Sequence, residues 1–151
     1  MARAAVGPSV LVLDASLAVK LVLPEPYSDA ARELIFGSEF AHLSILAPVI
    51  IMTEVTAAIT KSVRSRTISS ATARAAFATW KDLVESVFRE VTLLNNIDEA
   101  FELSLRLHHG LHDCLYLALA QSRDAVLATC DGVLAHKARR NGAVVRFVGA
   151  E

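Results

Sequence analysis

The sequence predicts an α/β fold with three layers, in which helices cover both faces of a mainly parallel sheet of four to five strands. One observation is that short apolar runs alternate along the chain with longer segments of helical spacing. A second is that the first run, Ser9–Asp14, is continuously apolar until its final acid. Such a run is typical of a strand that is buried on both faces, as in a parallel sheet.

Length and composition favour one domain, residues 1–151, because 54% of the 151 residues are hydrophobic and can build a sizeable core. No apolar run reaches the roughly 18–20 residues of a membrane span. The start of the chain lacks the long apolar region of a signal peptide. We therefore expect a soluble, cytoplasmic protein without a membrane partner. Cys114 and Cys130 lack metal-type spacing and are expected to be free buried thiols, with a disulfide or a catalytic thiol as alternatives.

The first half of the chain is expected to hold two strands and four helices. In order these are strand 9–14, a helix from 16 to about 24, helix 27–36, strand 43–47, a helix to about 66, and helix 70–86. Pro24 ends the first helix because proline cannot continue one. Pro48 suits the first turn of the third helix. Ser69 is an expected N-cap for the fourth.

The second half is expected to hold three strands and three helices. In order these are strand 90–95, helix 97–109, helix 113–123, strand 125–129, helix 131–140 and strand 143–148. Asn96 with Glu99 resembles a capping box at the start of helix 97–109. Gly142 ends the last helix.

Four acids are expected to lie at one edge of this sheet. Asp14 and Asp131 end the first and fourth strands, Asp113 opens a helix, and Glu54 lies about two turns into the helix after the second strand. Right-handed crossovers place helix starts at the carboxyl edge of the strands, where ligands of such sheets bind. The sequence therefore predicts a rim that carries four carboxylates.

Each acid also has a structural explanation. Glu54 lies on an apolar helix face, so an ion pair with a nearby Arg or Lys would compensate its burial. A helix N-cap would explain Asp113 or Asp131. Asp14, at the end of a buried strand, is more typical of a functional residue. Together the four carboxylates repel one another, and hard ions such as Mg²⁺ or Mn²⁺ relieve that repulsion. Such a site suits phosphoryl chemistry with a metal-activated water.

Four segments carry a resemblance to a known family. They are VLDASLAVKLVLPEP, APVIIMTEVTAAI, HDCLYLALAQ and VLATCDGVLAHKA. The chain from about residue 10 to 148 resembles PIN-domain ribonucleases, and most of all the VapC-type toxins of bacterial toxin–antitoxin pairs. The resemblance implies a PIN-like fold and an Mg²⁺- or Mn²⁺-dependent endoribonuclease that hydrolyses tRNA or rRNA.

The resemblance also implies roles for individual residues. Asp14 and Asp113 would be the principal metal ligands, and Glu54 and Asp131 would complete the site directly or through water. Two sequence features depart from the family pattern: a shorter loop before Asp113, and Gly132 after the fourth acid. Both features would affect how the substrate fits the site, and all four motif acids are still present.

Further implications concern hydrogen bonds and partners. Ser16 and Thr129, beside the first and fourth acids, would supply hydroxyl hydrogen bonds to the site. Family members usually form homodimers and are held inactive by a cognate antitoxin, here a VapB-like protein. RNA would be the substrate.

Basic residues near the acids have two interpretations. Lys61, Arg64 and Arg66 cluster at the end of the Glu54 helix. The helix dipole stabilises cations at this end, which is the structural interpretation, whereas contact with RNA phosphates is the functional one. Lys20, one or two turns after Asp14, is expected to pair with an acid, to contact a phosphate, or to be solvated.

The stretch HHGLHDC also suggests a histidine metal site. His108 and His109 are nevertheless expected at a helix end, where they would cap carbonyls or meet solvent. For His112 we expect packing or hydrogen bonding rather than substrate contact.

Three other functions compete with the nuclease. An HD-type phosphohydrolase is disfavoured because that family is all-helical. A haloacid-dehalogenase-like phosphatase needs a second acid two positions after Asp14, where this chain has Ser16. A non-catalytic PIN-like partner-binding domain is disfavoured by the four acids, and divalent-ion binding would distinguish it.

Overall fold

Residues 9–93 and 96–150 are described by a computed structural model. Five strands form one sheet in the order β3-β2-β1-β4-β5. Their bounds are β1 Val10–Leu13, β2 Ser44–Pro48, β3 Phe88–Thr92, β4 Val126–Thr129 and β5 Val145–Phe147. All neighbouring strands pair in parallel, which confirms the predicted α/β fold with a parallel central sheet.

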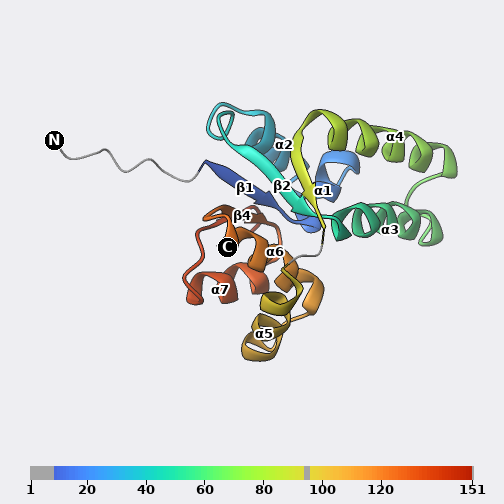
Figure 1. The fold of residues 1–151 in the computed structure, drawn as a ribbon. Coiled ribbons are helices and arrows are strands. Elements are labelled where there is room, and N and C mark those ends of the chain that lie inside the picture. Colours follow the sequence, from blue (N-terminus) through green and yellow to red (C-terminus); the bar gives the residue numbers. More distant parts are fainter. Residues whose placement is uncertain (1–8, 94–95, 151) are drawn as a thin grey trace.

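Seven helices within the described residues pack on the sheet. Their bounds are α1 Ala15–Val22, α2 Ser28–Phe36, α3 Ile50–Arg64, α4 Ser70–Ser86, α5 Ile97–Leu107, α6 Leu111–Ser122 and α7 Gly132–Arg140. Helices α1–α4 pack together on one side of the sheet, whereas α5, α6 and α7 lie on the other (Figure 1). The result is a three-layer arrangement, helix–sheet–helix.

The central strands are buried because helices cover both of their faces. Leu11, Val12 and Leu13 of β1 have no exposed surface. Helix α6 is apolar almost all round, and residues 114–120 are all buried, since α6 packs against the sheet on one side and α5 on another. This packing fixes the first turn of α6, which carries Asp113, relative to the sheet.

The strand order places a switch point between β1 and β4. From β1 the chain moves outward through β2 to β3, then returns to the other side of β1 as β4 and continues to β5. Crevices at such switch points, at the carboxyl ends of the strands, are the usual ligand sites of parallel sheets. Asp14 follows β1 and Asp131 closely follows β4, so the two acids flank this point.

The strand bounds differ from the sequence predictions by up to three residues, and β2 and β3 are the cases that involve other elements. Pro48 is the last residue of β2, paired with Thr92, and not part of the α3 first turn. Strand β3 spans Phe88–Thr92 instead of 90–95, and residues 94–95 lie outside the described part of the chain. Strand β3 begins at Phe88, which pairs with Ile45 and packs edge-on against the Trp80 ring. The β2–β3 register is irregular next to this pair, between Ile45 and Leu46.

Helix caps were predicted with mixed success. Ser69 caps α4 as expected, since its side chain accepts a hydrogen bond from the Thr72 N–H. The capping box at Asn96 is wrong, because the Asn96 side chain makes no capping hydrogen bond. Asp113 does not open α6 either, since the helix begins two residues earlier, at Leu111, after Gly110.

Both thiols are free, as predicted, with Cys114 buried and Cys130 partly buried. Burial raises the pKa of Cys130 to about 11, and it also raises the pKa of Cys114. Neither thiol is therefore suited to act as a thiolate nucleophile. Across the described residues, no helix is both long enough and apolar enough to cross a membrane.

Candidate metal-binding active site

The Asp14 carboxylate lies at the carboxyl end of β1 and is held by three donors. It is 2% exposed and forms the N-cap of α1. Its Oδ1 accepts hydrogen bonds from the Ser16 hydroxyl and, at 3.3 Å, from the Leu17 N–H. Its Oδ2 accepts from the Thr129 hydroxyl at 2.7 Å. Asp14 therefore has a fixed orientation.

Burial raises the pKa of Asp14 from 3.8 to about 6. The hydrogen bonds from Ser16, Thr129 and Leu17 oppose this shift, and the nearby charge of Asp113 adds to it. A buried carboxylate that no cation neutralises is costly to ionise. This is the electrostatic state of a ligand that a divalent cation would stabilise.

The Ser16 and Thr129 hydroxyls connect Asp14 to the next strand. Ser16 Oγ accepts from the Cys130 N–H at 2.9 Å, and Thr129 Oγ1 accepts from the Asp131 N–H at 3.0 Å. Each hydroxyl thus donates to Asp14 and accepts from the backbone just after β4. The two hydroxyls fix the spacing between the first and fourth acids.

Asp131 is the N-cap of α7. Its Oδ1 accepts from the Val133 and Leu134 N–H groups, at 2.9 and 3.0 Å. The cap uses Oδ1, so Oδ2 is not needed for it. The structural explanation for Asp131, a helix N-cap, is therefore correct, but the cap involves only one of the two carboxylate oxygens.

Glu54 reaches the site from α3, where it is the fifth residue, a little over one turn from the start. Its Oε1 accepts a hydrogen bond from the Tyr116 hydroxyl at 2.7 Å. The structural alternative, an ion pair of Glu54 with Arg or Lys, is not formed within the described part of the chain. Burial raises the pKa of Tyr116, which keeps the phenol protonated as a donor. Burial also raises the pKa of Glu54, while the Tyr116 hydrogen bond and the charge of His112 lower it.

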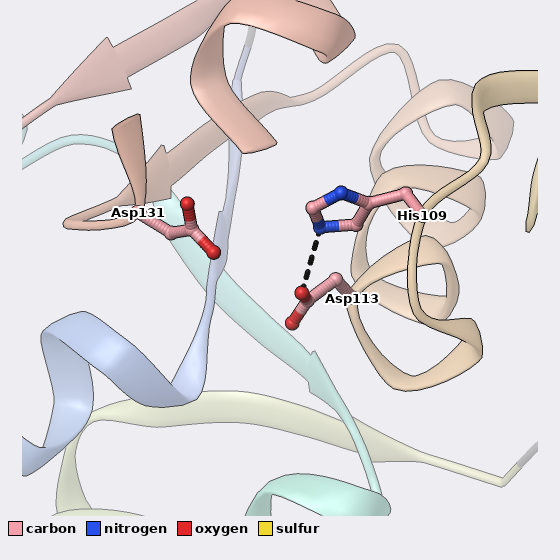
Figure 2. Close-up of side chains that lie close together, drawn as sticks. All are labelled: His109, Asp113 and Asp131. Atoms are coloured by element: carbon pink, nitrogen blue, oxygen red, sulfur yellow. Dashed lines mark hydrogen bonds and ion pairs between the residues drawn. The ribbon is translucent and has the colours of Figure 1, made fainter. Parts of the chain in front are cut away.

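Asp113 lies in the first turn of α6 and pairs with a histidine. Its Oδ2 is 2.8 Å from Nε2 of His109, as drawn in Figure 2. The side chain of His109 is 10% exposed and that of Asp113 is 34% exposed. The expectation that His109 would cap a carbonyl or meet solvent is wrong. For His108 the expectation is confirmed, because this exposed residue ends α5 as its C-cap, in the left-handed conformation with φ of 47°.

Three ligand atoms converge at this point. One atom each from His109, Asp113 and Asp131 lie within 4.8 Å of one another, and Figure 2 shows Asp131 facing the His109–Asp113 pair. The set includes two of the four predicted acids and a histidine. Asp14 and Glu54 lie outside it, but the charge of Asp113 raises the pKa of both. Asp113 is therefore the residue that links the two parts of the site.

An open hollow of about 330 Å³ lies beside Asp113. It is lined by Glu54, Gly110, Leu111, His112 and Asp113. His112 is exposed, in contrast to the predicted packing role. The hollow therefore opens two of the four carboxylates, Glu54 and Asp113, to solvent.

Comparison with known proteins gives the family. Residues 11–140 match the model of the PIN domain. The chain belongs to the PIN domain family. The comparison with curated proteins finds no match.

Two solved structures have the same fold as this PIN domain. PAE2754 from Pyrobaculum aerophilum has a TM-score of 0.64 at 21% identity, over 90% of this chain and 88% of its own. FitAcB from Neisseria gonorrhoeae has a TM-score of 0.59 at 11% identity, over 90% of this chain and 96% of its own. At these identities the likeness concerns the fold.

The structure does not bring all predicted basic residues of this PIN domain to the acids. Lys20 pairs with Glu25 at 3.2 Å, the acid-pairing alternative of the sequence analysis. Lys61 and Arg64 lie in the last turn of α3, and Arg66 follows it. With a rise of about 1.5 Å per residue, Lys61 is roughly 10 Å along the axis from Glu54.

His109 and Tyr116 are residues of the candidate site that were not predicted from the sequence. For His109 a signal was present, since it lies four positions before Asp113. Two side chains four residues apart meet on a continuous helix. Here the helix is broken at residues 108–110, yet the two side chains still meet because α6 begins immediately after the break. The spacing was visible in the sequence, but the assignment of His109 to a helix end concealed it.

Proposed function

We propose that this PIN domain is a divalent-metal-dependent endoribonuclease and the toxin of a VapC-type toxin–antitoxin pair. PIN domains are generally metal-dependent nucleases, which supports the activity class. The single observation that carries the proposal is the closeness of Asp113 to the other three acids: its carboxylate lies within 4.8 Å of that of Asp131, and its charge raises the pKa of both Asp14 and Glu54.

The residues present suit a hard divalent ion. Asp14 is a buried carboxylate with a raised pKa, and Asp113 and Asp131 offer oxygen atoms close together. Carboxylates are the preferred protein ligands of Mg²⁺ and Mn²⁺. Asp14 and Asp113 are proposed as the principal ligands, with Glu54 and Asp131 completing the site. A bound ion would polarise the phosphate and activate water for hydrolysis.

The remaining groups act by orientation. Ser16 and Thr129 hold the Asp14 carboxylate in one rotamer through their hydroxyls. Tyr116 holds Glu54 in the same way. The hollow beside Asp113 is proposed to admit the RNA backbone. Lys61, Arg64 and Arg66 are proposed phosphate contacts at the far end of α3, and Lys20 would have to leave Glu25 to contact a phosphate.

The partners and cell location follow from the same proposal. RNA, with tRNA or rRNA as the first candidates, is the proposed substrate. A VapB-like antitoxin is the proposed inhibitor, and a homodimer in the cytoplasm is the proposed working form. A single domain over residues 1–151 is part of the proposal as well.

The test is RNA cleavage by the purified protein with millimolar Mg²⁺ or Mn²⁺. Asp14→Asn and Asp113→Asn should each lower the cleavage rate by about 100-fold or more, because a lost metal ligand removes several kcal/mol of transition-state stabilisation. Asp82→Asn, an exposed acid on α4, is the matched control and should cleave like wild type.

Two results would contradict the proposal. One is cleavage that is unchanged in both site variants or that persists in a chelator. The other is a wild-type protein that neither cleaves RNA nor binds divalent ions, which would favour the non-catalytic binding domain. The toxin role is tested by co-expression with the protein encoded by the neighbouring reading frame, which should relieve growth inhibition.

A further inference from the structure

We infer that His109 is a nitrogen ligand of the site, so that the site favours first-row transition ions such as Mn²⁺ and Co²⁺ over Mg²⁺. The inference rests on the proposed function, since it concerns an ion bound by Asp113 and Asp131. It goes beyond that function because it adds a ligand of a different chemical type and predicts a metal preference.

The first argument is that the chain holds His109 in place. The His109 N–H donates to the Ser104 carbonyl at 3.2 Å, and the Ser104 hydroxyl donates to the His109 carbonyl at 2.6 Å. His108 turns the chain through the left-handed region immediately before. The backbone of His109 is therefore fixed on both sides, and the burial of its side chain and the contact with Asp113 restrain the imidazole.

The second argument is the direction of the ring. The His109 side chain is nine-tenths buried, yet its Nε2 points at the carboxylate of Asp113, with Asp131 facing the pair (Figure 2). A histidine that only fixed the rotamer of Asp113 would need that one partner. The third ligand atom, from Asp131, is what a metal site requires and an isolated hydrogen bond does not.

The third argument is the distance between the ligand atoms. Adjacent ligands of an octahedral ion, each about 2.1 Å from it, lie about 3.0 Å apart. Nε2 of His109 and Oδ2 of Asp113 are 2.8 Å apart. The two atoms are thus already spaced as neighbouring ligands of one ion would be.

The metal preference follows from the nitrogen. Mg²⁺ takes oxygen ligands and retains its waters, whereas imidazole binds first-row transition ions well, with affinity rising from Mn²⁺ to Co²⁺. The benefit of His109 should therefore be smallest for Mg²⁺, intermediate for Mn²⁺ and largest for Co²⁺. A residue that merely positions Asp113 would help all three ions by the same factor.

The experiment measures the Kd of Mg²⁺, Mn²⁺ and Co²⁺ by calorimetry for wild type, His109→Gln and His109→Ala. Glutamine keeps an amide donor for Asp113 but offers only oxygen to an ion. His108→Asn is the matched control, because asparagine tolerates the left-handed conformation of this position. Electron spin-echo spectroscopy of the Mn²⁺-loaded protein supplies a second readout, since a coordinated imidazole gives a ¹⁴N coupling.

We expect His109→Gln to weaken Co²⁺ and Mn²⁺ binding by roughly tenfold or more, with a smaller effect on Mg²⁺ and loss of the ¹⁴N coupling. His108→Asn should leave all of these unchanged. Equal weakening of the three ions in His109→Ala, with recovery in His109→Gln, would overturn the inference and leave the nuclease proposal standing. Failure of wild type to bind any of the ions would overturn both.

Discussion

The two corners of the candidate site are built differently. At the strand corner, Asp14 is almost fully buried and accepts hydrogen bonds from two hydroxyls and one backbone N–H. At the turn corner, Asp113 is about one-third exposed and has His109 as its hydrogen-bond partner among the described residues. The Asp14 carboxylate is therefore held in one orientation (locked), whereas the Asp113 carboxylate has fewer contacts and can change its orientation (adjustable).

This difference indicates a division of tasks. Under the proposed function, the locked carboxylate of Asp14 would supply one fixed metal ligand, at the cost of burying charge that its three hydrogen bonds only partly offset. An adjustable carboxylate can change its partner when an ion or a substrate arrives. Three sets of variants test whether the two corners differ in this way.

The largest effect is expected for Asp14→Asn in the absence of divalent ions. Asparagine retains the N-cap of α1 and removes the buried charge. The wild-type carboxyl, with a pKa of about 6 in the folded state and 3.8 as its ordinary value, must take up a proton on folding between these pH values. Wild type therefore loses stability relative to the variant as pH rises from about 4 to about 6.

Above pH 6 the variant should be more stable by about 3 kcal/mol, and near pH 4 the difference should vanish. Urea unfolding at both pH values, followed by the fluorescence of the single tryptophan, the buried Trp80, measures this. A difference that does not depend on pH would show that Asp14 is not the locked, desolvated group described above.

An intermediate effect is expected for Thr129→Val. Valine keeps the shape of the buried side chain but removes the donor to Asp14 and the acceptor for the Asp131 N–H. A loss of about 2 kcal/mol is expected for these unsatisfied groups. Because the Thr129 hydrogen bond lowers the pKa of Asp14, its loss should also move the pH-dependent step to higher pH.

Thr129→Ser is the control for this variant, since serine keeps the hydroxyl and loses a methyl group. It should retain the position of the pH-dependent step. If Val and Ser move this step equally, the hydroxyl does not hold Asp14 and the strand corner is less tightly built than proposed.

The smallest effect is expected at the turn corner. Ser104→Ala removes the donor to the His109 carbonyl and should cost about 1 kcal/mol. The pH-dependent step assigned to Asp14 should stay where it is, because this contact belongs to the other corner. Ser86→Ala, which removes a hydrogen bond to the Asp82 carbonyl within α4, is the control in urea unfolding. If Ser104→Ala and Ser86→Ala lower the free energy of unfolding equally, the Ser104 hydrogen bond does not stabilise the turn at His109 more than an ordinary surface hydrogen bond would.

The sequence was informative where local pattern and topology coincide. The apolar run of β1 and the acid that ends it are enough to place Asp14 at the carboxyl edge, because parallel strands align their ends. Asp131 follows by the same argument from β4. Ser69 was recognisable as a cap because the signal for capping is local.

The sequence was less informative about where β3 and α6 begin, because contacts between separate elements determine these positions. The start of β3 depends on how Phe88 packs against Trp80, and that contact spans two elements. Helix α6 begins two residues before the predicted start, because Gly110 and not Asp113 is its N-cap residue. The Asp113 side chain is therefore free of a capping role and pairs with His109. A pairing across a break between helices depends on the angle of the break, which residue spacing does not encode.

The capping roles of Asp14 and Asp131 have a consequence for sequence drift. A descendant that lacked the proposed nuclease activity would still need a side chain able to cap α1 and α7, and asparagine serves this purpose as well as aspartate. Selection for folding would thus keep Asp or Asn at both positions long after catalysis was lost. Glu54 and Asp113 form no helix cap, so replacement there would be the earliest mark of an inactive lineage.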